Sequence, residues 1–175
     1  MAEPAAFPLQ WQELTISERS QLAAAYPVSC LNDLVRYDNG LLMAREFIPI
    51  SEQLYNFEVR DDDIWIVTFP KAGTTWTQEM VWMLVNDVDQ EAGAVPASLR
   101  VPYMEINALM GPEVAEIPFP PEMVEVMVDP IGYAGKMAGP RVLKTHLPID
   151  CLPRGDLQHA DTVREAFQNL KKKKN

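Results

Sequence analysis

The sequence predicts an α/β fold with parallel strands, and three consecutive features of residues 64–85 carry this prediction. Residues 64–69, Ile-Trp-Ile-Val-Thr-Phe, form a β-branched and aromatic run that is typical of a strand buried on both faces. The turn Pro70–Gly73 follows, and from Thr74 apolar residues recur at helical spacing. The predicted apolar stripe consists of Trp76, Met80, Val81, Leu84 and Val85, with Thr77, Gln78 and Asn86 mostly off it. A strand, a tight glycine loop and a helix in this order indicate one unit of a parallel sheet.

The N-terminal residues 1–40 are expected to form a helical segment. A helix is predicted from Thr15, because Glu18 lies three residues later, at the spacing of a capping box, and Pro27 ends the run. The main domain is expected to follow over residues 41–155.

A turn and two short elements are predicted between this segment and the apolar strand. Asp38-Asn39-Gly40 is a turn signal. Residues 41–48 are expected to form a short strand. Ser51 is expected to cap a short helix that runs through Phe57.

The later part of the chain is rich in proline. Ten of the 15 prolines lie between Pro96 and Pro153, which predicts long ordered loops with short elements between them. Residues 141–143, with the apolar pair Val142 and Leu143, predict a second strand that ends in Lys144–Pro148. Residues 156–175 are expected to form a divergent polar tail, helical from Asp161 onward.

The composition excludes several classes of function. The chain has 25 acidic and 15 basic residues and a net charge of −10, which argues against non-specific nucleic-acid binding. Its two cysteines, Cys30 and Cys151, have no metal-binding or redox spacing, so no metal is expected. The N-terminus lacks the pattern of a signal peptide, and no apolar run approaches the ~18 residues of a membrane span. We therefore expect a reduced, soluble, cytoplasmic protein without membrane contact.

The loop between the predicted strand and helix has the features of an anion site. The first backbone N–H groups of a helix have no partner within the helix, and its dipole places positive charge there. Lys71 adds a full charge, Gly73 permits close approach of a ligand, and the hydroxyls of Thr74 and Thr75 can donate. The alternative is an ordinary strand-to-helix connection with capping threonines. The sequence G-x-x-x-x-G-K-[ST] is absent, so ATP or GTP hydrolysis is not the first expectation.

Three motifs resemble those of the cytosolic sulfotransferases, and they occur in the order found in that family. TFPKAGTTWTQEMVWML at residues 68–84 resembles the family's nucleotide loop, and RVLKTHLPIDCLP at residues 141–153 resembles its R-x-x-K-T-H-L-P segment. Between them, RVPYME at residues 100–105 resembles R-x-P-[FY]-[LM]-E. The resemblance covers roughly residues 40–155. It implies a three-layer α/β fold around a parallel sheet of the P-loop-like sulfotransferase type.

The resemblance also implies a donor, 3′-phosphoadenosine 5′-phosphosulfate (PAPS). The residues implied to hold its 5′-phosphate and sulfuryl oxygens are Lys71, Ala72, Gly73, Thr74 and Thr75. Ala72 stands where the family often has Ser or Cys, a mild change at a position that contributes mainly its backbone N–H. Trp76 is implied to stack on the adenine, although the residues alone leave a core position equally open.

The same resemblance implies roles around the second strand. His146 is implied to be the general base that deprotonates a hydroxyl or amine of a small acceptor, such as a phenol, an alcohol or a steroid-like molecule. Lys71 is implied to stabilise charge on the departing phosphate, and Lys144 charge on the transferring sulfuryl group. Tyr103, Lys144, Thr145 and His146 are implied to contact the acceptor. A structural histidine, a surface lysine and a core tyrosine are the alternatives, while His159 has no motif around it and is expected to be solvated.

Some segments of the family pattern do not occur in this sequence. After Pro153 the family continues with V-x-Y-[VIL]-x-R-[ND]-x-K-D-x-x-x-S and later with R-K-G-x-x-G-[DE]-W, and it has a C-terminal homodimer motif. We therefore expect an incomplete sulfotransferase domain with a divergent C-terminus. The alternative function is an inactive fragment that binds a phosphate ligand or a partner chain, and a kinase-like enzyme ranks third.

Overall fold

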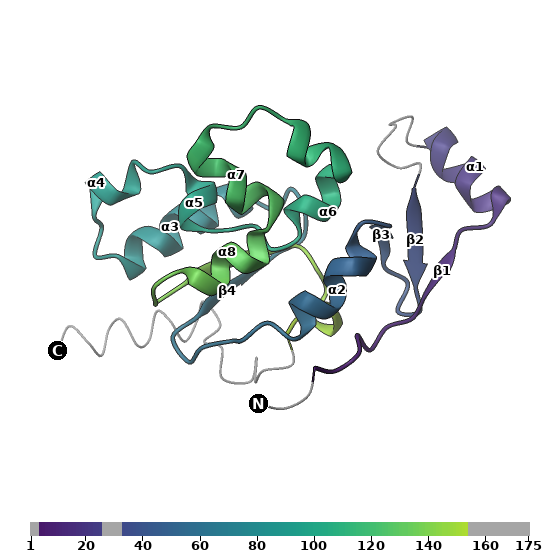
Figure 1. Cartoon of the computed structure of the whole chain (residues 1–175), viewed down its shortest axis with the longest axis horizontal. Coiled ribbons are helices and arrows are strands. Elements are labelled where there is room, and N and C mark those ends of the chain that lie inside the picture. Colours follow the sequence, from purple (N-terminus) through teal and green to yellow (C-terminus); the bar gives the residue numbers. More distant parts are fainter. Residues whose placement is uncertain (1–3, 26–32, 154–175) are drawn as a thin grey trace.

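The computed structural model describes residues 4–25 and 33–153 of the 175-residue chain (Figure 1). The predicted tail, with its helix from Asp161, and His159 lie outside the described residues. The elements are, in chain order, β1 (Trp11–Glu13), α1 (Ile16–Ala25), β2 (Leu34–Tyr37), β3 (Leu42–Ala44), α2 (Phe47–Tyr55), β4 (Ile64–Val67), α3 (Thr74–Val85), α4 (Gln90–Gly93), α5 (Ala97–Arg100), α6 (Ile106–Met110), η2 (Pro112–Glu116), α7 (Pro121–Val128), α8 (Pro130–Lys136), β5 (Val142–Thr145) and η3 (Ile149–Cys151).

The two predicted apolar strands pair in parallel, so the expected α/β class is confirmed. β4 and β5 run side by side from Ile64 opposite Val142 to Val67 opposite Thr145. A single parallel bridge between Tyr103 and Lys144 extends the sheet on the other side of β5. Both strands therefore end at the same edge, where α/β sheets place their ligands.

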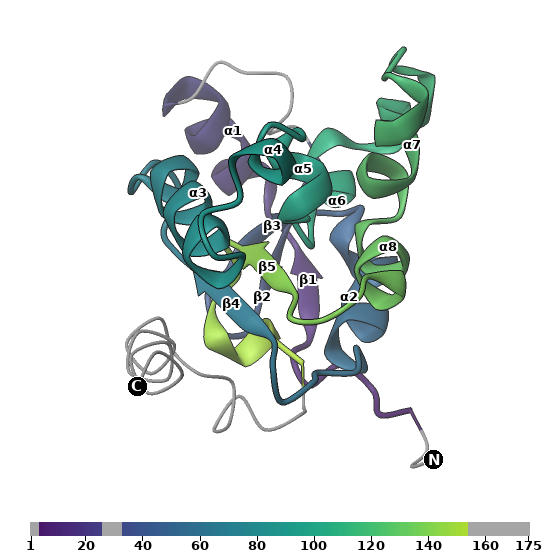
Figure 2. The same ribbon diagram turned by 90° about the vertical axis from the view of Figure 1, so that its left-hand side faces the viewer.

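Helices cover both faces of this parallel pair, which gives the three layers expected (Figure 2). Alternate residues of a strand point to opposite faces. Trp65 and Leu143 belong to a core cluster that includes side chains of α2 and α8. The opposite face packs against α3, in a cluster of buried side chains formed by Ile64, Ile66, Val81, Trp82, Val101 and Val142.

The strand prediction was too long at its carboxyl end. β4 ends at Val67, whose side chain is already exposed, and Phe69 is 81% exposed. Past Val67 the chain leaves the sheet for the loop before α3, so the last apolar residues of the run lose their neighbours. An apolar run in the sequence does not by itself show at which residue the strand ends.

The buried face of α3 differs from the predicted stripe. Its buried residues are Thr74, Gln78, Val81 and Trp82. Trp76 is 76% exposed and Met80 is 56% exposed. Apolar side chains lie on several sides of α3, so the helical periodicity of the sequence does not show which side is buried. The geometry of the loop before the helix decides which face packs on the sheet.

The first forty residues contain two strands besides the expected helix. β1, β2 and β3 form an antiparallel sheet in that order. The predicted capping box at the start of α1 is confirmed, because the Thr15 N–H donates to Glu18 Oε2 at 2.8 Å and the Glu18 N–H donates to Thr15 Oγ1 at 3.3 Å. The hydrogen bonds with Arg36 and Thr15 lower the pKa of the Glu18 carboxyl to about 2.

The helix α2 begins earlier than predicted. Its first residue is Phe47, which is completely buried, and the strand expected over residues 41–48 is limited to Leu42–Ala44. Ser51 lies inside the helix, where its hydroxyl donates to the Ile48 carbonyl oxygen at 2.8 Å, and it is therefore not the cap. Burial of an aromatic side chain outweighs a local capping preference here.

The proline-rich part of the chain contains more helix than expected. Short helices α5 to α8 follow one another, and Pro121 and Pro130 occupy the first turns of α7 and α8. Proline is well suited to that position, because its missing N–H is not needed there and its φ is already helical. The prolines therefore divide this region into short helices instead of preventing them.

A buried ion pair connects the amino ends of the two parallel strands. Arg141, just before β5, donates through Nε to Asp63 Oδ1 at 2.6 Å and through Nη2 to Asp63 Oδ2. Its guanidinium also donates to the carbonyl oxygens of Ala134 and Glu58 and lies 4.8 Å from the centre of the Phe57 ring. Both side chains of the pair are at most 1% exposed.

Candidate active site

The loop after β4 has a backbone conformation that favours glycine at its last position. Gly73 has a φ of +89°, in the left-handed region, and Lys71 has a φ of +63°. A Cβ at Gly73 would have no atom within 4 Å, so backbone conformation and not crowding makes glycine the favoured residue there. This turn places the start of α3 at the carboxyl edge of the sheet.

Gly73 can be tested directly through its backbone. We expect Gly73→Ala to lower the free energy of unfolding by about 1–2 kcal/mol, because alanine is strained in the left-handed region. Urea unfolding measures the change. The matched control is Gly135→Ala within α8, where a Cβ also meets no atom and φ is not positive, so alanine is expected to be neutral or stabilising. Equal effects at the two glycines would contradict this account.

The start of α3 presents unpaired donors. Within the part of the chain that the structure describes, the backbone N–H groups of Thr74 and Thr75 have no backbone acceptor, whereas those of Trp76 and Thr77 both donate to the Gly73 carbonyl oxygen at 3.1 Å. Lys71 is exposed on the same loop. The unpaired N–H groups, the dipole of the twelve-residue helix and the lysine charge together favour an anion at this point.

His146 lies directly against this loop. Its Nδ1 is 2.8 Å from the Thr68 carbonyl oxygen and 3.2 Å from Thr68 Oγ1, which in turn is 2.6 Å from Thr74 Oγ1. A carbonyl oxygen only accepts, so the shorter contact assigns a proton to Nδ1. Nε2 has no partner among residues 4–25 and 33–153, and its lone pair is available to take a proton.

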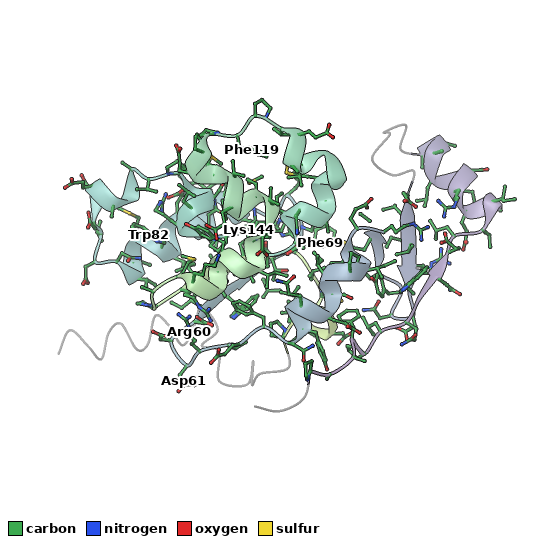
Figure 3. All side chains as sticks on the ribbon, viewed as in Figure 1. Arg60, Asp61, Phe69, Trp82, Phe119 and Lys144 are labelled. Carbon is green, nitrogen blue, oxygen red and sulfur yellow. The ribbon has the colours of Figure 1, made fainter. Side chains whose placement is uncertain are left out.

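Tyr103 and Lys144 form the neighbouring part of the site. Lys144 Nζ (labelled in Figure 3) lies 4.3 Å from the centre of the Tyr103 ring, a cation–π contact. The same ring meets His146 edge-on, with 5.1 Å between the ring centres. Tyr103 thus bridges the lysine and the histidine. Partial burial raises the pKa of the Tyr103 hydroxyl and lowers that of the Lys144 ammonium group.

Glu105 is buried beneath these residues. The His146 backbone N–H donates to its Oε1 at 2.6 Å, and Oε2 has no hydrogen-bond partner among the described residues. Burial raises the pKa of this carboxyl to about 7, against the opposite effect of hydrogen bonds from His146 and Thr145. A buried acid with a pKa this high is characteristic of functional sites.

Two cavities border the site. The larger, of about 620 Å³, is lined by residues that include Thr68, Phe69 and His146. The smaller, of about 330 Å³, is lined by residues that include Tyr103, Lys144 and Gln78 of α3. The first cavity thus opens beside His146 and the second beside Lys144, whereas the loop residues 71–75 line neither of them.

The structure brings four of the predicted site residues together. Thr74 and His146 meet through Thr68, and Tyr103 contacts both Lys144 and His146. Trp76 is exposed, so of the two possibilities left open for it the core position is excluded. Thr145 is completely buried, its hydroxyl oxygen accepts the Leu147 N–H at 3.0 Å, and it lines neither cavity.

Sequence reasoning gave no role to two residues of the site. Thr68 belongs to the predicted strand at residues 64–69. Glu105 is the last residue of the motif at residues 100–105 and has no predicted role. Both act through contacts with His146, which is 78 and 41 residues away in sequence. The signal available for Glu105 was its place at the end of the motif RVPYME, residues 100–105, which does not by itself predict burial.

No metal-binding cluster and no membrane-spanning helix are found in the part of the chain that the structure describes. Groups of three or more His, Cys, Asp or Glu side chains suited to a metal ion do not occur within residues 4–25 and 33–153. None of the helices there is long and apolar enough to cross a bilayer.

The fold and the loop define an α/β protein with a candidate anion site at the carboxyl edge of its parallel strands, and comparison with known proteins makes the class specific. The family model of the sulfotransferase domain matches residues 61–159. The chain therefore belongs to the sulfotransferase family, as its motifs implied.

Curated relatives and solved structures agree with this assignment. Luciferin sulfotransferase of Photinus pyralis is 35% identical over 61% of this chain and 29% of its own length. Sulfotransferase 1A1 of Canis lupus familiaris is 33% identical over 78% of this chain and 41% of its own length. The chain thus spans less than half the length of these relatives.

Among solved structures, retinol dehydratase in complex with androsterone and the inactive cofactor PAP has a TM-score of 0.70 and 25% identity, covering 87% of this chain and 49% of that one. The structure of retinol dehydratase with retinol and PAP has a TM-score of 0.67 and 26% identity, covering 84% of this chain and 48% of that one.

Proposed function

We propose that this chain acts in the transfer of a sulfuryl group from PAPS to a hydroxyl or amine of a small acceptor. One observation carries the proposal: a histidine with a free Nε2 is hydrogen-bonded, through Thr68 and Thr74, to the start of a helix suited to binding an anion. A base beside an anion site is the arrangement that group transfer to a nucleophile requires.

The donor loop fits a phosphosulfate. The unpaired N–H groups of Thr74 and Thr75 and the exposed Lys71 are suited to its anionic oxygens, and Gly73 leaves the approach open. The Ala72 N–H, by contrast, already donates to the Phe69 carbonyl oxygen at 3.2 Å. Trp76 is the third residue of α3 and its side chain is exposed. It is proposed to stack on the adenine. The solved neighbours bound to PAP support this choice of donor.

The chemistry assigned to this chain is proton transfer and charge stabilisation. His146 Nε2 takes the proton of the acceptor hydroxyl or amine, while Thr68 holds the ring through Nδ1. Lys71 and Lys144 stand where negative charge develops, on the departing phosphate and on the transferring group. PAPS supplies the activated sulfuryl group and a stable leaving group.

The acceptor is proposed to be a phenol, an alcohol, a steroid-like molecule or an amine. Tyr103 offers a flat wall next to His146 and Lys144, and the two cavities are of a size for small molecules. Thr145 is proposed to contribute by holding the turn that carries His146. We also propose a cytoplasmic location, which is supported by the 30% identity to cytosolic sulfotransferase 1 of Danio rerio over 75% of this chain.

The proposal predicts a preference among nucleotides. We expect adenosine 3′,5′-bisphosphate to bind about tenfold or more tightly than ATP, measured by calorimetry, and [³⁵S]PAPS to label a phenol acceptor in a transfer assay. Lys71→Ala is expected to weaken bisphosphate binding. Its matched control, Lys136→Ala on the surface of α8, removes the same charge and is expected to have no effect. Tighter, magnesium-dependent ATP binding would contradict the proposal.

A further inference from the structure

The buried carboxyl of Glu105 contacts the turn that carries the histidine. Its side chain is 1% exposed, and its Oε1 accepts the His146 backbone N–H at 2.6 Å. Its other oxygen, Oε2, has no hydrogen-bond partner within the described residues. An unpartnered carboxylate oxygen in the interior destabilises the fold, so this acid is poorly explained by stability alone.

The backbone holds Glu105 in this position from a neighbouring segment. The Lys144 N–H donates to the Pro102 carbonyl oxygen at 3.0 Å, and the Met104 N–H donates to the Lys144 carbonyl oxygen at 2.9 Å. These bonds fix residues 102–104 along the free edge of β5. Glu105 follows directly, at the end of the sheet where His146 leaves β5.

Lys144 is the basic side chain whose charge responds to Glu105. Burial lowers the pKa of the Lys144 ammonium group, and the negative charge of Glu105 opposes that effect. The other titratable groups near Glu105 are Tyr103, His146 and Cys151. Burial raises the pKa of Cys151 to about 12 and also raises that of Tyr103, so both are neutral near pH 7.

We propose that Glu105 is a positioning residue of the site, whose buried carboxylate accepts the His146 N–H and so fixes the turn that carries this histidine next to Lys144. The consequence for catalysis rests on the function proposed above. Lys144 stabilises developing charge only as a cation, so a negative charge beside it preserves its role in a partly desolvated position. Glu105 contacts neither cavity and acts through these two residues.

The proposal predicts a change in the titration of Lys144 that needs no turnover. Competitive acetylation followed by mass spectrometry measures the pH at which half of Lys144 reacts. In Glu105→Gln, which keeps an oxygen acceptor but removes the charge, this pH is expected to fall by about one unit. Lys136 serves as the internal reference, and the control variant Glu125→Gln, which removes a surface carboxylate 2.6 Å from Lys136, is expected to leave Lys144 unchanged.

Glu105→Asp separates charge from position. It keeps the carboxylate but shortens the side chain, so the Lys144 titration is expected to stay near that of the wild type. The transfer rate is expected to fall, because the bond to the His146 N–H is lost. The alkaline limb of the rate profile is expected to shift to lower pH in Glu105→Gln and to stay in place in Glu105→Asp.

A measurement on the unmodified chain covers the case in which the variants do not fold. With ¹³C-labelled glutamate, one carboxyl carbon is expected to titrate at about pH 7 by NMR, well above the exposed glutamates. An unchanged Lys144 titration in folded Glu105→Gln, or no glutamate titrating near neutrality, would overturn the proposal. Absence of sulfuryl transfer by the wild type would instead refute the proposed function, while the labelling of Lys144 still decides the role of Glu105.

Discussion

Replacing His146 by alanine is expected to lower the rate of sulfuryl transfer by about 10²–10⁴-fold, the usual contribution of a general base. Its Nε2 has no hydrogen-bond partner among the described residues, and Thr68 holds the ring through Nδ1. Removing the imidazole takes away the base but leaves the unpaired N–H groups at the start of α3. Donor binding is therefore expected to survive.

The measurement compares steady-state transfer from PAPS to a phenol with calorimetric binding of adenosine 3′,5′-bisphosphate. His146→Gln is the matched variant, because it keeps a polar side chain of similar length without a basic nitrogen, and it is expected to be as inactive as the alanine variant. Turnover near the wild-type rate in either variant would remove His146 from the role of base. Loss of nucleotide binding would show that His146 holds the donor loop instead.

The parallel sheet and the donor loop were predictable because their signals are local. Residues 64–69 are apolar except for Thr68, Gly73 marks a left-handed position, and the helix begins at the next residue. The second strand was predicted at residues 141–143 from the apolar pair Val142 and Leu143, and β5 extends from Val142 to Thr145. Once the two strands are taken as parallel, their carboxyl ends must meet, and with them Lys144, His146 and the loop.

The face of α3 and the start of α2 were not predictable, because they depend on distant contacts. Gln78 is buried and Met80 exposed, although hydropathy favours the reverse. Gln78 lies four residues after Thr74, on the same buried face of α3. Phe47 starts α2 within a core formed with Phe7 and Tyr37, whose rings meet it edge-on at 6.0 Å between ring centres. No local pattern around Phe47 contains that information.

In the site, the residues proposed to touch the ligand were easier to predict than those proposed to support them. His146 and Lys71 stand in short motifs with an evident chemistry. Glu105 and Thr68 act by holding His146 across long sequence separations, and a carboxyl with a raised pKa requires knowledge of its burial. Supporting residues therefore become visible only when the packing is known.

The largest expected effect on stability concerns the buried pair of Arg141 and Asp63. We expect Arg141→Met to lower the free energy of unfolding by about 3–5 kcal/mol, because it leaves the Asp63 carboxylate as an uncompensated charge in the interior. The same change removes hydrogen bonds to the carbonyl oxygens of Ala134 and Glu58. Urea unfolding measures the loss. Lys136→Met, which breaks an exposed ion pair with Glu125, is the matched control and is expected to cost about 1 kcal/mol or less.

A double-mutant cycle distinguishes the unpaired charge from the loss of packing. Asp63→Ala alone leaves the Arg141 guanidinium buried without its partner and also frees the Arg60 N–H, which donates to Asp63 Oδ2 at 2.8 Å. In Asp63→Ala/Arg141→Met neither charge remains, so the total loss is expected to be smaller than the sum of the two single losses by about 0.5–3 kcal/mol. Additive losses would mean that the two side chains stabilise the sheet separately. A favourable coupling would instead show that the pair acts as one unit joining the amino ends of β4 and β5, at the edge opposite the one where the loop, Lys144 and His146 meet.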